Sequence, residues 1–132
     1  MHIFMCLDDR NGISFNGRRL SSDRVVCQRI MGLAQGNLWI APKTAKLFSE
    51  YSVCIAADFL TRADMRDSCF VEDTEFFASM SKVTTMTIFR WNRHYPSDVK
   101  MPDSVLAEWK LVSSIQFPGY SHDIITEERY ER

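Results

Sequence analysis

Asp23 is the residue whose type and position most suggest chemistry in this chain. It follows two serines where a helix is expected to begin, and the apolar residues Val25 and Val26 come next. A carboxylate partly buried by such neighbours can donate a proton or anchor a cationic heterocycle. An acid in a first helical turn also complements the helix dipole, which is the purely structural interpretation. The sequence leaves both interpretations of Asp23 open.

Other chemistry-bearing patterns are missing. The three histidines, His2, His94 and His122, lie far apart in sequence and show none of the spacings that prepare a zinc site, so we expect no bound metal. The chain contains no G-x-S-x-G nucleophile turn, no G-x-G-x-x-G turn and no G-x-x-x-x-G-K phosphate loop. Acyl transfer and nucleotide binding therefore have no local signature.

A second candidate site interleaves cations with aromatic rings: Arg90, Trp91, Arg93 and Tyr95. Such a patch can bind or cleave RNA, because bases stack on the rings while the cations contact phosphates. The alternative is a strand end with an interfacial tryptophan and solvated arginines. Sixteen Lys+Arg against seventeen Asp+Glu give a net charge of -1, which favours the alternative and speaks against nucleic acid as a partner.

The length and composition predict one packed domain covering residues 1–132. Of the 132 residues, 45% are hydrophobic and 25% charged, so a globular core is expected. No apolar run reaches the roughly 20 residues of a membrane helix, and the N-terminus lacks the basic start of a signal peptide. We expect a cytoplasmic protein with no membrane contact. Four scattered cysteines, Cys6, Cys27, Cys54 and Cys69, are predicted to be reduced core residues.

The elements that must position these residues alternate between strand and helix in the first part of the chain. Short apolar runs predict buried strands over 2–7, 37–41, 51–56 and 68–71. A polar loop to about Leu20 precedes the longest helix, which starts at Ser21–Asp23, places Val26, Ile30 and Leu33 on one face and stops at Gly36. Pro42 opens a helix through Phe48, and a brief helix runs from Asp73 or Thr74 to Met80.

The second part of the chain has the period-two pattern of β-structure. Residues 82–91 predict a strand, and apolar residues over 109–117 alternate with polar ones. Pro118–Gly119 then turns the chain into a strand over 124–130. An α/β fold is therefore predicted, with a mostly parallel central sheet flanked by helices and a C-terminal antiparallel hairpin.

Taken in order, these elements resemble dihydrofolate reductase. Residues 3–13 and 16–18 are similar to that family's first strand and following loop, and 38–44 to its Gly-Arg-Lys-Thr turn. Residues 70–77 lie where the family has Val-Ile-Gly-Gly before a short helix. The closing segments, 86–93, 101–102, 109–112 and 128–132, follow its final strands. The resemblance spans nearly the whole chain, and it implies that Asp23 corresponds to the catalytic carboxylate.

The departures from the family pattern concern its NADPH site. Glu72 and Asp73 stand where the family has two glycines, and their charges would repel a diphosphate. Ala41–Pro42 replaces the phosphate-binding Gly-Arg, while Lys43 and Thr44 remain. These four residues, Lys43, Thr44, Glu72 and Asp73, mark the cofactor turns that the resemblance implies. The chain is also shorter than is usual for the family.

The sequence thus predicts a divergent member of this family that is a non-catalytic module binding a small molecule or a protein, with no cofactor. One alternative is a reductase that uses NADPH as hydride donor and Asp23 as proton donor. Another is RNA binding or cleavage through residues 90–95. The chain also resembles short sequences that carry a ribonuclease Z label, but it lacks the zinc-binding His-x-His-x-Asp-His run of that family.

Overall fold

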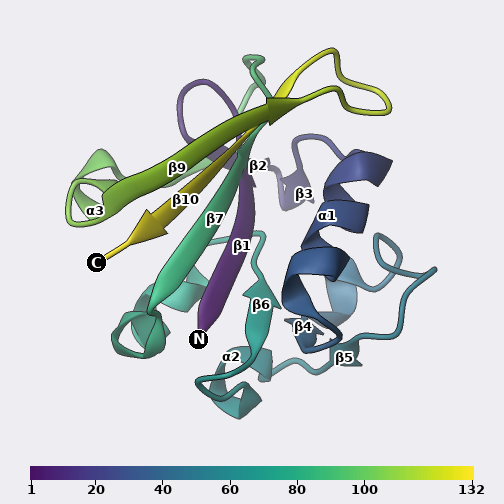
Figure 1. The fold of residues 1–132 in the computed structure, drawn as a ribbon, viewed down its shortest axis with the longest axis vertical. Coiled ribbons are helices and arrows are strands. Elements are labelled where there is room, and N and C mark those ends of the chain that lie inside the picture. The colour runs from purple at the N-terminus through teal and green to yellow at the C-terminus, as the bar shows by residue number, and fades with distance from the viewer.

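A seven-stranded sheet forms the centre of the computed structural model, which describes residues 1–132 (Figure 1). The strand order is β5-β4-β6-β1-β7-β10-β9. The strands are β1 (His2–Leu7), β4 (Leu38–Ile40), β5 (Cys54–Ile55), β6 (Ser68–Phe70), β7 (Thr85–Arg90), β9 (Lys110–Phe117) and β10 (Ile125–Glu131). β10 alone runs against its neighbours β7 and β9, and all other pairs are parallel. The predicted mostly parallel sheet with a closing antiparallel hairpin is confirmed.

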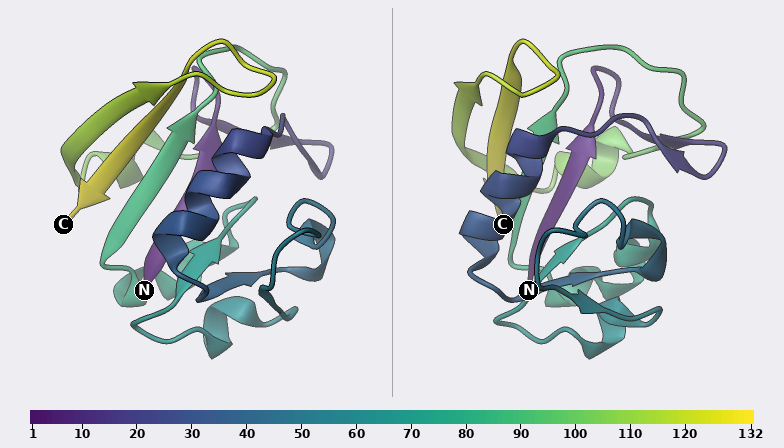
Figure 2. Two further views of the ribbon diagram at one scale, coloured as in Figure 1. Left: turned by 45° about the vertical axis from the view of Figure 1, so that its right-hand side comes forward. Right: turned by 90° about the vertical axis from the view of Figure 1, so that its right-hand side faces the viewer.

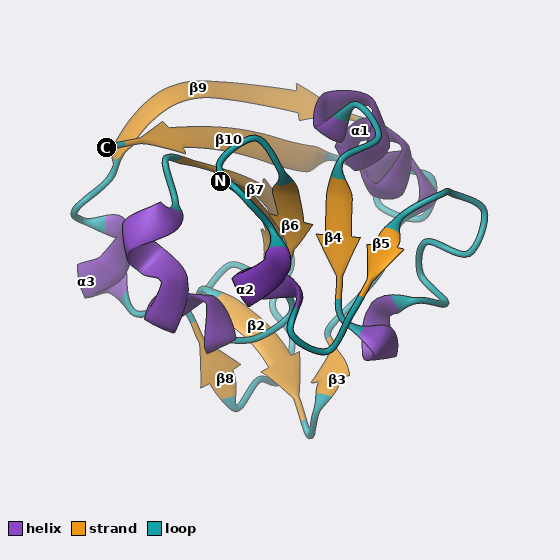
Figure 3. Ribbon diagram, turned by 90° about the horizontal axis from the view of Figure 1, so that it is seen from below, coloured by secondary structure: helices purple, strands orange, loops and turns teal.

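Successive residues of β1 belong alternately to two hydrophobic clusters, one on each face of the sheet. Ile3, Met5 and Leu7 belong to one cluster, and Phe4 belongs to the other. Helix α1 (Arg24–Ala34) covers the face of Phe4. Three short helices cover the opposite face: α2 (Phe59–Arg62), α3 (Asp103–Leu106) and the 3-10 helix η2 (Glu75–Lys82) (Figure 3). Because both faces of the sheet are covered, the strands near its centre have continuous apolar runs in their sequence.

A second, smaller sheet stands where a polar loop is predicted before α1. It consists of β3 (Arg18–Arg19), β2 (Gly12–Phe15) and β8 (Val99–Lys100), with β2 antiparallel to both neighbours. β2 and β3 form a hairpin around Asn16 and Gly17, which both have positive φ. The partner strand β8 is about 85 residues further along, so local sequence patterns do not reveal the pairing. This sheet forms one wall of the groove described below.

Helix α1 begins one residue later than its predicted start. Asp23 is the N-cap and its side chain accepts from the Val25 N–H, whereas the sequence predicts that the two preceding serines cap the helix. The helix ends at Ala34 because Gln35 takes a left-handed conformation with φ 53°, followed by Gly36 at φ 83°. Leu33 is exposed, so the apolar face is narrower than predicted.

Several predicted elements are shorter or more exposed than expected. Pro42 opens only a 3-10 turn, η1 (Pro42–Thr44), and turns replace the rest of the predicted helix to Phe48. The strand predicted over 51–56 is reduced to β5, an exposed edge strand. In β9 the side chains of Leu111 and Ile115 are 47% and 46% exposed, because no helix covers this edge of the sheet.

All four cysteines are free thiols, but their predicted burial is only partly correct. Cys27 and Cys69 are buried, Cys6 is half-buried and Cys54 lies exposed on the edge strand β5. Burial raises the pKa of Cys27 to about 11 and that of Cys69 to about 12. None of the helices has the length and the apolar run that crossing a membrane requires.

Candidate functional site

The carboxylate of Asp23 lies buried at the start of α1 and accepts hydrogen bonds from two segments. Oδ1 accepts from the backbone N–H groups of Val25 (2.9 Å) and Tyr120 (3.0 Å). Oδ2 accepts from the Ser121 N–H at 2.9 Å, the Ser121 hydroxyl at 3.2 Å and His122 Nδ1 at 2.9 Å. The loop after β9 therefore folds over the first turn of α1 (Figure 2).

These donors fix the ionisation of Asp23. Burial alone would raise the pKa of this carboxyl group, but the Tyr120 N–H, the His122 ring and the Ser121 and Val25 N–H groups hold it well below its usual range. Asp23 is therefore an anion with both oxygens engaged. In this state the carboxyl group carries no proton to donate.

His122 connects Asp23 to a serine hydroxyl. Nδ1 donates to the ionised Asp23 carboxylate, so in the neutral ring that nitrogen carries the proton and Nε2 is an acceptor. The Ser21 hydroxyl lies 2.9 Å from Nε2, and the Tyr95 hydroxyl lies 3.4 Å from the same atom. The ring stacks on Trp91, with centroids 4.6 Å apart and an interplanar angle of 23°. Ser21, His122 and Asp23 thus form a continuous hydrogen-bonded chain, which we call the Ser–His–Asp cluster.

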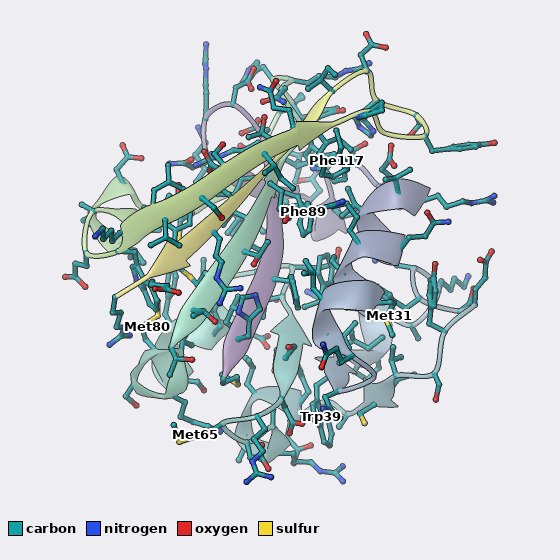
Figure 4. All side chains as sticks on the ribbon, in the orientation of Figure 1. Met31, Trp39, Met65, Met80, Phe89 and Phe117 are labelled. Atoms are coloured by element: carbon teal, nitrogen blue, oxygen red, sulfur yellow. The ribbon has the colours of Figure 1, made fainter.

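A small apolar cavity of about 20 Å³ borders this cluster, with room for about one water molecule. Ser21, Asp23 and Trp91 contribute to its wall, together with apolar side chains from α1, β6 and the segment after Arg19. The apolar lining includes Leu20, Val26, Ile30, Phe70 and Val71. On the same side of the sheet, Phe89 packs edge to face against Phe117, with ring centroids 6.3 Å apart (Figure 4).

The four residues at the implied cofactor turns come together, joined by Arg19. The Arg19 guanidinium donates through Nε and a terminal nitrogen to the two Glu72 oxygens, at 2.6 and 2.9 Å. The Thr44 hydroxyl also donates to Glu72, at 2.6 Å, and Lys43 Nζ lies 2.8 Å from an oxygen of Asp73. The hydrogen bond to Glu72 raises the pKa of Arg19, and that to Asp73 raises the pKa of Lys43.

These ion pairs line a groove of about 490 Å³ that also contains Ser14, Gly17, Arg18 and Val99. The groove shares Arg19 and Glu72 with the small cavity, so the Arg19–Glu72 pair stands between the two spaces. Arg18 lines the groove, is exposed and makes no ion pair. The groove is thus polar, with one unpaired cation among matched charges.

The residues proposed for RNA binding do not form one exposed patch. Arg90 pairs with Glu128 at 2.8 Å and Trp91 is only 3% exposed beneath His122. The Tyr95 N–H donates to Asp8 and its hydroxyl approaches His122, while Arg93 is exposed. The aromatic rings therefore contribute to the Ser–His–Asp cluster, while Arg90 is held by Glu128.

Asp23 is identifiable from the sequence, whereas its neighbours Ser21 and His122, and Arg19 beside the groove, are not. Asp23 and His122 are 99 positions apart, and Arg19 and Glu72 are 53 apart, so no local spacing relates them. The histidines do not share a site: His2 bonds to Thr85 and Thr87, and His94 lies 3.6 Å from Asp8. No three metal-binding side chains gather at one place in the structure.

Comparison with known proteins identifies the fold. No protein-family model and no curated protein matches the chain. Among solved structures, dihydrofolate reductase from Enterococcus faecalis, complexed with NADP(H) and RAB-propyl, matches 99% of this chain and 95% of its own, with a TM-score of 0.70. The sequence identity is 10%, so the likeness establishes a shared fold. The chain therefore has the dihydrofolate reductase fold, as the sequence resemblance predicted.

Proposed function

We propose that this protein uses a dihydrofolate-reductase-like fold to bind a small ligand and does not transfer hydride from a nicotinamide cofactor. The observation that carries the proposal is the position of Glu72. Its carboxylate, bound by Arg19 and Thr44, lies in the wall of both the cavity and the groove. A ligand spanning both spaces would have to displace a two-bond ion pair.

Charge in the groove supports the exclusion of a dinucleotide. A pyrophosphate carries two negative charges and would meet Glu72 and Asp73, whose partners Arg19 and Lys43 are already engaged. Two like charges 4 Å apart repel by about 1 kcal/mol in water and about 4 kcal/mol near a protein surface. Arg18 is the one unpaired cation of the groove, so a ligand with a single negative charge fits this balance better.

Ligand titrations monitored by thermal unfolding test the proposal. A ligand at a hundredfold excess over its Kd stabilises the folded state by about 2.7 kcal/mol, so micromolar binding gives a measurable shift. We expect no shift with NADPH, NADH or dihydrofolate. Benzoate, a small monoanion, is expected to raise the Tm, and Arg18→Gln is expected to abolish that rise.

A matched pair of variants addresses the charge argument. Glu72→Gln with Asp73→Asn releases Arg19 and Lys43 and is expected to increase affinity for NADPH relative to the wild type. The control Glu108→Gln removes one acidic charge away from the groove and should behave as the wild type. Micromolar binding of NADPH by the unaltered protein would contradict the proposal.

A nicotinamide-dependent reductase is the second candidate, because the structural neighbour is described in complex with NADP(H). In that case Asp23 would have to supply the proton. The five hydrogen bonds that it accepts favour the anion and weigh against this role. Oxidation of NADPH in the presence of dihydrofolate, lost in Asp23→Asn, would favour the reductase.

A further inference from the structure

The Ser–His–Asp cluster has the connectivity that activates a serine hydroxyl. The Ser21 hydroxyl lies 2.9 Å from His122 Nε2, and the other ring nitrogen lies 2.9 Å from Asp23 Oδ2. The order is therefore nucleophile, base and orienting carboxylate. Such a constellation is recognised by geometry and role, independently of the fold and of chain order.

The surroundings bury the His122 ring and fix its orientation. Asp23 and His122 have side chains that are 0% and 3% exposed, so their hydrogen bond is shielded from water. Because Asp23 accepts at Nδ1, Nε2 is free to take a proton from Ser21. Stacking on Trp91 fixes the plane of the ring. These contacts give His122 the orientation and the tautomer required of a general base.

Ser21 is half-buried and lines the cavity, so it is reachable from that space. The cavity is largely apolar and has room for about one water molecule, so it can accept the single methyl group of an acetyl ester. The backbone N–H groups of Ser22 and Arg24, which follow Ser21 in sequence at the start of α1, make no hydrogen bond within the chain. Unpaired N–H groups at a helix start can stabilise the negative oxygen of a tetrahedral intermediate.

We propose that Ser21 is the nucleophile of an acyl-transfer site, with His122 as general base and Asp23 as its orienting carboxylate, acting on esters of short carboxylic acids. Ser21 Oγ bonds to the ester carbonyl carbon while its proton passes to His122 Nε2. The bond to the alcohol oxygen then breaks, and Nε2 returns the proton to that oxygen. Water next attacks the acylated Ser21, giving up a proton to Nε2, and Oγ recovers it as the acid leaves.

Tyr95 is a competitor of Ser21 in this scheme. Its hydroxyl approaches Nε2 at 3.4 Å and so competes with Ser21 for the same acceptor. Tyr95→Phe removes the competitor and leaves the ring that packs nearby. Ester cleavage is expected to increase in this variant, and a lower rate would contradict the assignment of Nε2 as the acceptor of the Ser21 proton.

Covalent labelling tests the nucleophile directly. Diisopropyl fluorophosphate reacts with activated serines, and intact-mass and peptide analysis locate the modified residue. We expect one adduct on Ser21, none on Ser21→Ala, and wild-type labelling of Ser113→Ala, which alters an exposed serine on β9. Circular dichroism of each variant verifies folding. Labelling spread over several serines, or no adduct on Ser21 in the folded protein, overturns the assignment.

Hydrolysis of p-nitrophenyl acetate provides the second readout. The measurement is made in a Cys54→Ser background, because the exposed Cys54 thiol could also be acylated. Ser21→Ala is expected to lower the rate at least tenfold, to the level of the uncatalysed reaction. An unchanged rate in Ser21→Ala contradicts the proposal. The proposal is independent of the ligand titrations above, since it requires neither the groove nor a nicotinamide.

His122→Gln is expected to abolish the labelling of Ser21, and if this variant unfolds, Ser21→Cys still tests activation by the histidine. The introduced thiol then occupies the hydroxyl position and is expected to react with iodoacetamide at least tenfold faster than Cys54, because Nε2 promotes the thiolate. An introduced thiol that reacts no faster than Cys54 overturns the role of His122 as a base.

Discussion

Gly119 shows how tightly the site depends on single atoms. A Cβ at this position would lie 2.7 Å from Asp23 Oδ2, 2.8 Å from Ile125 Cδ1 and 2.9 Å from the His122 carbonyl oxygen. The Gly119 N–H also donates to that carbonyl, which closes the turn. We expect Gly119→Ala to lower the free energy of unfolding by about 1–3 kcal/mol, because backbone and buried carboxylate must both move. Urea denaturation measures the change.

The same substitution should weaken the Ser–His–Asp cluster. Displacing Asp23 lengthens its bond to His122, so labelling of Ser21 by diisopropyl fluorophosphate is expected to slow together with the loss of stability. Full stability in Gly119→Ala would show that the 118–122 loop has more room than the structure gives it.

At the residue scale, Asp23 is identifiable from the sequence but its environment is not. A carboxylate before a helical pattern identifies it, while four of the five hydrogen bonds that it accepts come from three residues about 100 positions later. The same holds for Glu72. Its charge marks a departure from a glycine turn in the sequence, but its two hydrogen bonds from Arg19 depend on the β2–β3 hairpin, which places Arg19 beside it. Tertiary contacts of this kind leave no periodic signal.

At the element scale, α1 contains a site where stability is expected to rise. Gly32 lies inside the helix, exposed, and a Cβ added there would have no atom within 4 Å. Glycine in a helix interior is less stable than alanine by about 0.5–1 kcal/mol. Gly32→Ala is therefore expected to shift the urea midpoint upward by that free energy with an unchanged m-value. A decrease would mean that α1 has a contact at Gly32 that the structure lacks.

Other elements show where periodicity predicts correctly and where it does not. β1, β6 and β7 are predictable because both of their faces are buried. The closing hairpin is also predictable. β9 has the predicted alternation, yet Leu111 and Ile115 are exposed like most of the strand, since alternation defines two faces without saying whether either one is covered. The small sheet and helices α2 and α3 have four residues or fewer per element and give too short a pattern to recognise.

At the scale of the whole molecule, buried titratable groups couple stability to pH. His2 lies between Thr85 and Thr87 on β7, and burial, with help from Arg129 and the N-terminal ammonium group, lowers its pKa from 6.5 to about 4. The unfolded chain therefore binds a proton at higher pH than the folded chain. The contribution of neutral His2 to the free energy of unfolding is fully present above pH 6.5 and is lost as the pH falls towards 4.

Asp8 and Asp23 add a second stage at lower pH. Burial would raise the pKa of Asp8, but hydrogen bonds from the Tyr95, Gly12 and Arg10 N–H groups have the larger effect and lower it. The hydrogen-bond donors around Asp23 lower the pKa of that carboxyl group in the same way. The stability from these ionised groups is present above the ordinary aspartate value of 3.8 and is lost as the pH falls through their lower folded values. Acid should therefore lower the free energy of unfolding in two ranges of pH.

The prediction for the whole molecule is a decline in the free energy of unfolding of about 3 kcal/mol between pH 6.5 and 4 from His2, followed by a further decline below pH 4. Urea denaturation at a series of pH values measures both stages. His2→Gln keeps a side chain that can bond to Thr85 and Thr87 but does not titrate, so it should flatten the first stage and leave the second unchanged. Superimposable wild-type and His2→Gln curves between about pH 7 and 4 would refute the assignment to His2, and the early decline would then have to come from another group.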